Sequence, residues 1–189
     1  MSIFDKLKNA GSQGGGAAFD KNQKEATFTF AALPESLAEM QALPEATLDS
    51  PFKTAALALC ALCAYAADKE IGTEMLNWLR GPKGAMTQME KQFLSNRFAD
   101  GHYYIPFSYF NGAKPENDYT PTEPFTVRIT ANPYSYQEVG FASLWLMSGG
   151  ADSPRNFKLR KVESTGKWYL WDQFIMVGIR DPKSNNPWA

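Results

Sequence analysis

The feature that most constrains this chain is a segment that predicts a helix with almost no polar side. Ser50 is a good N-cap and Pro51 suits the first helical position. The run from Ala55 to Ala67 then contains only Ala, Leu, Cys and Tyr. It is shorter than the roughly 20 residues that cross a bilayer. A helix that is apolar nearly all round is stable in water only when other elements bury it, so this helix is expected at the centre of the fold.

Three weaker helices are expected around it. Prolines bound the first, over 36–42, because proline starts helices and disrupts their interiors. The second covers 74–80 and stops at Gly81-Pro82. The third begins with the capping box Thr87-Gln88-Met89-Glu90 and ends near Ala99. This third helix carries the apolar residues Met89, Phe93 and Leu94.

Strand patterns dominate the second half of the chain. Apolar and polar residues alternate over 125–130, and 141–147 is apolar on both faces. Two more strands are expected near Phe157 and over 168–174, and 26–30 is a short extended piece. The aromatic stretch 103–110 is also β-prone. Strands this closely spaced pair antiparallel, since parallel pairing needs a long crossover.

These elements predict an α+β fold, in which an N-terminal helical part packs on a four- to five-stranded antiparallel meander. We expect one domain over 26–189, with its helical part at 34–99 and its sheet part at 103–180. Residues 1–25 form a short N-terminal amphipathic segment followed by a Gly-rich linker. Trp188, in a polar tail, is expected to dock back on the domain as an anchor.

Composition excludes several classes of function. Lys and Arg number 19 and Asp and Glu 20, so the net charge is −1 and no positive field attracts nucleic acid. No apolar signal region follows the first residues, so a cytoplasmic location is expected. Residues 1–8 allow at most weak membrane association. The oligomeric state is left open.

Candidate reactive residues are few. Cys60 and Cys63 form a Cys-x-x-Cys pair, but they fall inside the apolar helix, where a core role is expected. A zinc site would need further ligands, and His102 is the single histidine. No nucleophile elbow is present. We therefore expect no catalytic residue, no metal and no cofactor.

The loop from Ser148 to Arg155 is the most suggestive for ligand binding. Two glycines can aim backbone N–H groups at an anion, and Arg155 can add a fork of donors. A plain turn between two strands explains the same residues. If a pocket lies between helices and sheet, the convergent polar groups to test are Asp152, Arg155, Tyr109 and His102.

Aromatic residues, 14% of the chain, concentrate in the sheet half. Aromatics on both faces of a strand imply that both faces are covered. The helices would cover one face, and a partner, a ligand or the loop 111–124 the other. A core plus one aromatic interaction surface for a protein partner is the preferred interpretation.

Several short pieces of the chain carry a resemblance to other proteins. They are Leu33-Pro34-Glu35-Ser36-Leu37, Pro106-Phe107-Ser108-Tyr109-Phe110, Pro115-Glu116-Asn117, Tyr119-Thr120-Pro121, Asn132-Pro133-Tyr134-Ser135-Tyr136 and Ser148-Gly149-Gly150-Ala151-Asp152-Ser153-Pro154-Arg155. Through these pieces the chain resembles a family of uncharacterised bacterial proteins of about 190 residues. The resemblance implies no activity, cofactor or site residue. The element order and the final Gly-Lys-Trp-Tyr strand also look like cystatin-like or nuclear-transport-factor-like folds, an analogy with little functional weight.

The functional expectation is a non-enzymatic binding or interaction module in the cytoplasm. It rests on the missing catalytic constellation and on the surplus of aromatic residues. The alternative is a small-molecule-binding or enzymatic pocket between the helices and the sheet.

Overall fold

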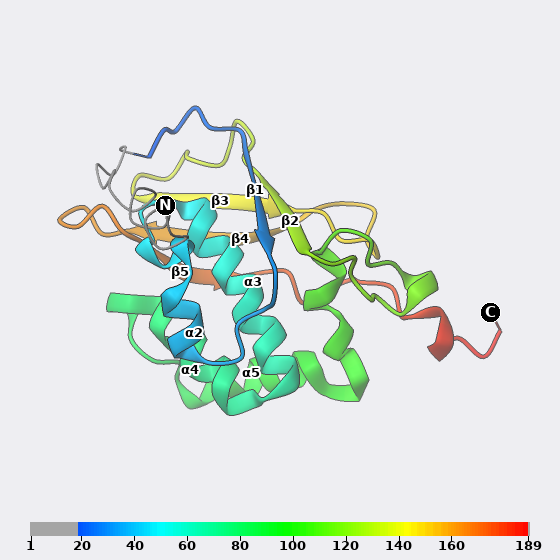
Figure 1. The fold of residues 1–189 in the computed structure, drawn as a ribbon. Coiled ribbons are helices and arrows are strands. Elements are labelled where there is room, and N and C mark those ends of the chain that lie inside the picture. The colour runs from blue at the N-terminus through cyan, green and yellow to red at the C-terminus, as the bar shows by residue number, and fades with distance from the viewer. Residues whose placement is uncertain (1–18, 189) are drawn as a thin grey trace, which may run out of the picture.

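The computed structural model describes residues 19–188, which form a five-stranded antiparallel sheet with helices gathered on one of its faces (Figure 1). The expected α+β fold is confirmed. The expectations for the N-terminal segment 1–8 and for most of the Gly-rich linker lie outside the described residues. The longer elements are β1 (Glu25–Phe30), α2 (Leu37–Ala42), α3 (Pro51–Ala67), α4 (Lys69–Arg80), α5 (Gln88–Phe98), β2 (Phe125–Thr130), β3 (Phe141–Leu146), β4 (Arg155–Lys161) and β5 (Trp168–Gln173).

The strands follow one another across the sheet in chain order, from β1 to β5. β1 pairs with β2 along its whole length, although α2, α3, α4 and α5 all lie between these two strands in the chain. β2 and β3 pair only at Ile129–Leu146 and Thr130–Trp145, so they diverge beyond that point. A hollow of about 710 Å³ opens where they diverge, beside Ser108, Tyr109 and Ser148.

The apolar helix α3 forms the centre of the core, as its sequence predicts. It contacts all five strands as well as α4. The Ser50 side chain caps it by accepting from the N–H of Phe52, at 3.3 Å. Its polar Thr54 is fully buried and donates its hydroxyl to the Trp168 carbonyl at 2.8 Å, which satisfies the group and ties α3 to β5.

The two cysteines are core residues. Cys60 and Cys63 lie on α3, 0% and 3% exposed, with free thiols. Burial raises the pKa of both thiols above the ordinary value, which keeps them protonated and unreactive. Within residues 19–188, no group of three or more His, Cys, Asp or Glu side chains is placed to hold a metal ion.

Helix α4 is longer than its sequence pattern indicates. It begins at Lys69 rather than Glu74, because the Asp68 carboxylate accepts from the N–H groups of Glu70 and Ile71 at 2.9 and 3.1 Å. Gly72 permits a very close approach of α4 to α3. A Cβ at this position would lie 2.3 Å from the Tyr65 Cα.

The prediction that 103–110 is β-prone and opens the sheet part is wrong. A kinked 3-10 stretch covers 99–104, and a short 3-10 helix covers 106–109. Asp100 and Gly101 adopt left-handed backbone angles just after α5 ends, which turns the chain back. Pro106, which lacks a backbone N–H, begins the second 3-10 helix. The strand that the first half of the chain supplies to the sheet is instead β1.

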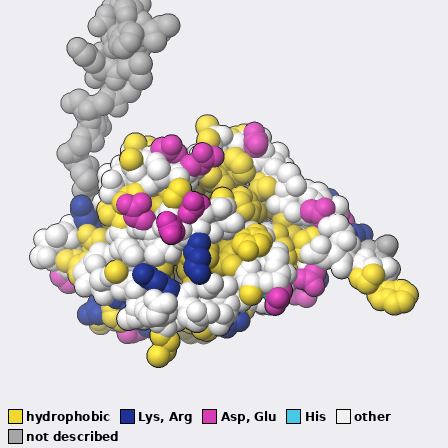
Figure 2. Space-filling model, turned by 90° about the horizontal axis from the view of Figure 1, so that it is seen from below, with side chains coloured by type: hydrophobic (Ala, Val, Ile, Leu, Met, Phe, Trp, Pro, Cys, Tyr) yellow, Lys and Arg dark blue, Asp and Glu magenta, His cyan; other side chains and the backbone are white. Residues whose placement is uncertain are grey.

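Several large apolar side chains lie on the surface. Trp188 is 92% exposed, so the expectation that it anchors the tail is wrong. Figure 2 shows hydrophobic side chains gathered on one face, with acidic and basic side chains around them. In the described part of the chain, no helix is both long and apolar enough to cross a membrane.

The close crossing of α3 and α4 gives a first prediction. Replacing a helical glycine by alanine normally stabilises a helix by about 1 kcal/mol. In Gly72→Ala the new methyl meets the Tyr65 backbone, so we expect net destabilisation of about 1–3 kcal/mol. Chemical denaturation measures the change. Thr73→Ala, at the next position of α4, is the control and should change the free energy of unfolding little; equal effects would contradict the close crossing.

Candidate functional site

A cleft of about 330 Å³ lies between α4, α5 and β5. This volume is at the lower end of the range for small-ligand sites. Its lining is mostly apolar and also contains charged side chains of both signs. The side chains that line this α4–α5–β5 cleft are Leu62, Leu76, Arg80, Lys83, Met86, Met89, Glu90, Phe93, Leu94, Leu170, Trp171, Asp172 and Gln173.

Helix α5 forms the outer wall of the cleft and is weakly attached to the core. Its buried residues are Leu94 and Phe98. Two apolar side chains of this helix, Met89 and Phe93, are instead 81% and 53% exposed. They lie one turn apart along the helix, where they can reach a molecule entering the cleft.

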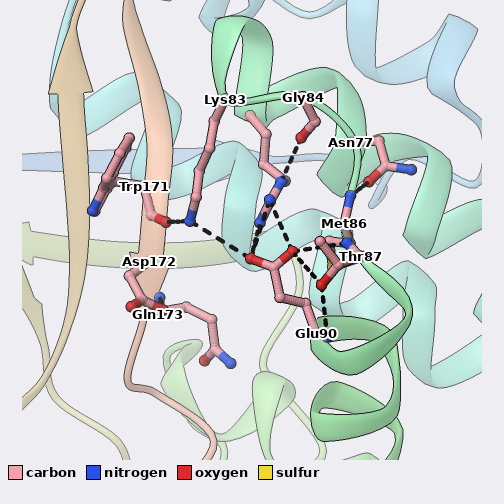
Figure 3. Close-up of polar contacts among 10 residues, drawn as sticks. Asn77, Lys83, Gly84, Met86, Thr87, Glu90, Trp171, Asp172 and Gln173 are labelled. Carbon is pink, nitrogen blue, oxygen red and sulfur yellow. Dashed lines mark hydrogen bonds and ion pairs between the residues drawn. The ribbon is translucent and has the colours of Figure 1, made fainter.

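The N-terminal end of α5 is fixed by an ionic clasp between Arg80 and Glu90. The buried Arg80 guanidinium donates to both carboxylate oxygens of Glu90 at 3.1 Å, and its Nε donates to the Gly84 carbonyl at 2.7 Å. Glu90 also completes the predicted capping box, since its carboxylate accepts from the Thr87 N–H at 2.8 Å. Figure 3 shows the Glu90 carboxylate at the meeting point of several contacts, including those with Thr87 and Lys83.

Lys83 joins this clasp to the sheet. Its ammonium donates to the Trp171 carbonyl, lies 4.8 Å from the centre of the Trp171 ring and is 3.8 Å from Glu90 Oε1 (Figure 3). Partial burial and the nearby Arg80 lower the pKa of Lys83, against the opposite effect of Glu90. The 81–87 connection is thereby held against β5.

The other end of α5 has separate attachments. The Phe98 ring packs on the Tyr65 ring with centroids 4.7 Å apart, and Lys69 Nζ lies 2.9 Å from Ser95 Oγ. Helix α5 is therefore fastened at both ends, while its middle borders the cleft.

Two of the sequence-predicted ligand residues, Tyr109 and Arg155, contact one segment near the C-terminus. The buried Tyr109 donates its hydroxyl to the Ile175 carbonyl, and burial raises its pKa above the ordinary value. The Arg155 guanidinium donates to the carbonyls of Val177 and Gly178 at 2.9 and 3.0 Å and to Ser153. Arg155 thus fastens this segment to β4, and Tyr109 fastens it to the 3-10 helix at 106–109.

The other two predicted residues lie nearby but have different partners. Asp152 is 92% exposed at its side chain and pairs with Arg180 at 2.9 Å. The His102 ring meets the Tyr104 ring edge-on, and Tyr104 donates to Asp181 at 2.8 Å. None of the four lines the α4–α5–β5 cleft. Their role in ligand binding stays a prediction.

The glycine-rich loop before Arg155 uses its backbone N–H groups within the protein. The Gly149 N–H donates to the Ser108 carbonyl at 2.9 Å, and the Gly150 N–H donates to Ser148 Oγ at 3.0 Å. A Cβ on either glycine would lie about 2 Å from an oxygen, of Ala113 or Tyr119. Close packing thus accounts for both glycines.

Sequence reasoning identified the capping box that contains Glu90 but missed the site around it. Nothing in the local pattern indicates that Arg80 meets Glu90 across the Gly81-Pro82 stop, or that Lys83 reaches β5. One usable signal was present. Met89 and Phe93 form an i,i+4 apolar pair on a helix that is otherwise mostly polar.

The fold and the cleft together define an α+β domain with a ligand-sized hollow between its helices and its sheet. Residues 32–183 match the family described as "Domain of unknown function (DUF6935)", and the chain belongs to this family. The matched range contains the whole cleft, whereas β1 precedes it. No curated protein and no solved structure matched the chain.

The Arg80–Glu90 clasp predicts a pH dependence. The pKa of Glu90 lies below its ordinary value, chiefly because the Thr87 N–H donates to it, with Arg80 adding to the effect and partial burial opposing it. A lowered folded-state pKa contributes stability above the ordinary glutamate value, about 4.3, that is lost as pH falls through the folded value. Glu90→Gln should therefore melt lower at pH 7, by about 2–4 °C for 1 kcal/mol lost, and converge with the unmodified protein in acid.

Thermal unfolding followed between pH 7 and acid conditions checks this. Glu74→Gln is the matched control, because Glu74 is an exposed residue of α4. Its side chain makes no hydrogen bond or ion pair with the rest of residues 19–188. Parallel melting curves for the Glu90 variant and the unmodified protein at every pH would refute the assignment.

Proposed function

We propose that this protein is a non-enzymatic binding module, and that the α4–α5–β5 cleft takes up a small amphiphilic molecule. The observation that carries the proposal is a mostly apolar lining that also contains side chains of opposite charge, Arg80, Lys83, Glu90 and Asp172. Sites of this composition bury the apolar part of a ligand and orient it through a few polar groups.

The exposure of Met89 and Phe93 supports the same proposal. It is unfavourable to expose two neighbouring large apolar side chains to water, and a molecule that covers them removes this cost. Methionine adapts its shape to varied apolar surfaces, and an aromatic ring supplies large contact area. A ligand in the cleft gives both side chains a partner.

A protein partner at the aromatic surface of the sheet is the second candidate. Phe141 and Trp171 are half-buried residues of β3 and β5, and their rings meet edge-on at 5.5 Å. Several other aromatic residues of the sheet half, including Tyr109, Tyr119 and Trp168, are instead core residues. The aromatic surface is thus smaller than the composition suggests.

The binding test uses N-phenyl-1-naphthylamine, a neutral apolar dye whose fluorescence rises in apolar surroundings. We expect saturable binding to the whole chain and about tenfold weaker binding to Phe93→Ser, since burial of an aromatic side chain is worth about 1.5–3 kcal/mol and 1.4 kcal/mol is a factor of ten.

Tyr134→Ser provides the control. Tyr134 is 69% exposed, also carries a ring, and does not line the cleft. Its variant should bind the dye like the unmodified protein. Equal loss in both variants, or no saturable binding to the folded protein, would refute the cleft as the site.

A further inference from the structure

A second hollow, of about 530 Å³, adjoins the cleft and has a different chemistry. It shares Arg80, Lys83, Leu170 and Trp171 with the cleft, and within the described chain its lining contains no acidic side chain. We call it the basic groove. Its lining residues are Arg80, Pro82, Lys83, Arg160, Lys161, Val162, Tyr169, Leu170 and Trp171.

Two cations of the groove share one aromatic ring. The Arg160 guanidinium and the Lys83 ammonium each lie 4.8 Å from the centre of the Trp171 ring. Such contacts hold a cation near a ring face and leave its other donors free. The Arg160 side chain is exposed and makes no hydrogen bond or ion pair with any of residues 19–188, and besides Trp171 it lies over the Phe141 ring, 5.2 Å from its centre. Its donors are therefore available to a ligand.

The charges around the groove do not balance. Glu90 faces Arg80 and Lys83, and Glu163 lies 2.9 Å from Lys161. These two carboxylates oppose four cations. Asp172 also acts on Lys83, but it lines the cleft rather than the groove. An excess of positive charge on one side of a nearly neutral protein favours an anionic ligand.

The aromatic walls of the groove are held rigidly. Tyr169 packs on the backbone of Gly81, where a Cβ would lie 2.3 Å from its ring, and Gly81 has a φ of +47° that favours glycine. Trp171 is fixed by the carbonyl contact with Lys83 and by the Phe141 ring. Rigid rings beside cations form a surface for a flat, apolar group attached to an anion.

We propose that the basic groove binds a phosphate monoester carried on a planar ring, the chemistry of a mononucleotide. Arg160 contacts the phosphate together with Lys83 or Lys161, and the ring lies against Tyr169 and Trp171. Guanidinium groups match phosphate oxygens geometrically. This inference is independent of the proposed function, since Phe93 lines the cleft and Arg160 lines the groove.

Titration calorimetry of the whole chain with AMP at low ionic strength tests the proposal. We expect one-site binding that weakens as salt is added, with inorganic phosphate binding more weakly and adenosine more weakly still. Phosphate binding as tightly as AMP would overturn the role of the ring. Adenosine binding as tightly as AMP would overturn the role of the anion.

Arg160→Glu should weaken AMP binding at least tenfold. Arg97→Glu is the matched control, because Arg97 also lies over a ring, 4.7 Å from the centre of Phe93, but does not line the groove. Its affinity should stay within twofold. If Arg160→Glu fails to fold, as judged by its melting curve, Arg160→Gln replaces it. Unchanged AMP affinity in the folded Arg160 variant would overturn the site.

The same variants separate this proposal from the previous one. Arg160→Glu should leave dye binding in the cleft unchanged, and Phe93→Ser should leave AMP binding unchanged. A loss of both activities in either variant would mean that the cleft and the groove are not separate sites, which overturns the inference.

Discussion

The structure depends on the burial of one helix. Helix α3 has no polar side, so it is stable only where the sheet covers one side and α4 covers another. Burial of its leucines supplies a large share of the hydrophobic stabilisation, at about 25 cal/mol per Å² of apolar surface removed from water. The positions of β1 to β5 and of α4 follow from the need to surround it.

The same constraint explains why the candidate sites lie at the periphery. Helices α3 and α4 fill the space against the sheet. Little apolar surface of the core is therefore left for α5 to pack on. Its attachment relies on the Arg80–Glu90 clasp at one end and on Phe98 at the other. Because these attachments hold the ends of the helix, a hollow is left along its middle, and the cleft occupies that space.

Much of the architecture could be predicted from local patterns. The caps at Ser50 and Thr87, the proline boundaries and the alternation in β2 each act within a few residues, and each was confirmed. The stretch 103–110 misled the prediction, because its aromatic residues have high β propensity. There Pro106 and the left-handed turn before it decided the conformation, and Tyr109 was buried by long-range packing.

The candidate sites were less predictable for a physical reason. The Arg80–Glu90 clasp, the α4–α5–β5 cleft and the basic groove are each formed by residues from different elements. Lys83, for example, meets Trp171 of β5, and Arg160 of β4 meets the same ring. Charge patterns along the chain carry no information about such pairs. The overall charge of −1 conceals a local excess of cations, since charges that cancel in composition are separated in space.

By itself, therefore, the sequence determined that a buried central helix, flanking helices and an antiparallel sheet would form, because periodicity and caps act locally. Tertiary structure alone decided that β1 forms the edge of the sheet beside β2, that Met89 and Phe93 face outward, and that Arg80 and Glu90 meet. These outcomes depend on how already formed elements share a limited apolar surface, and no window of a few residues contains that information.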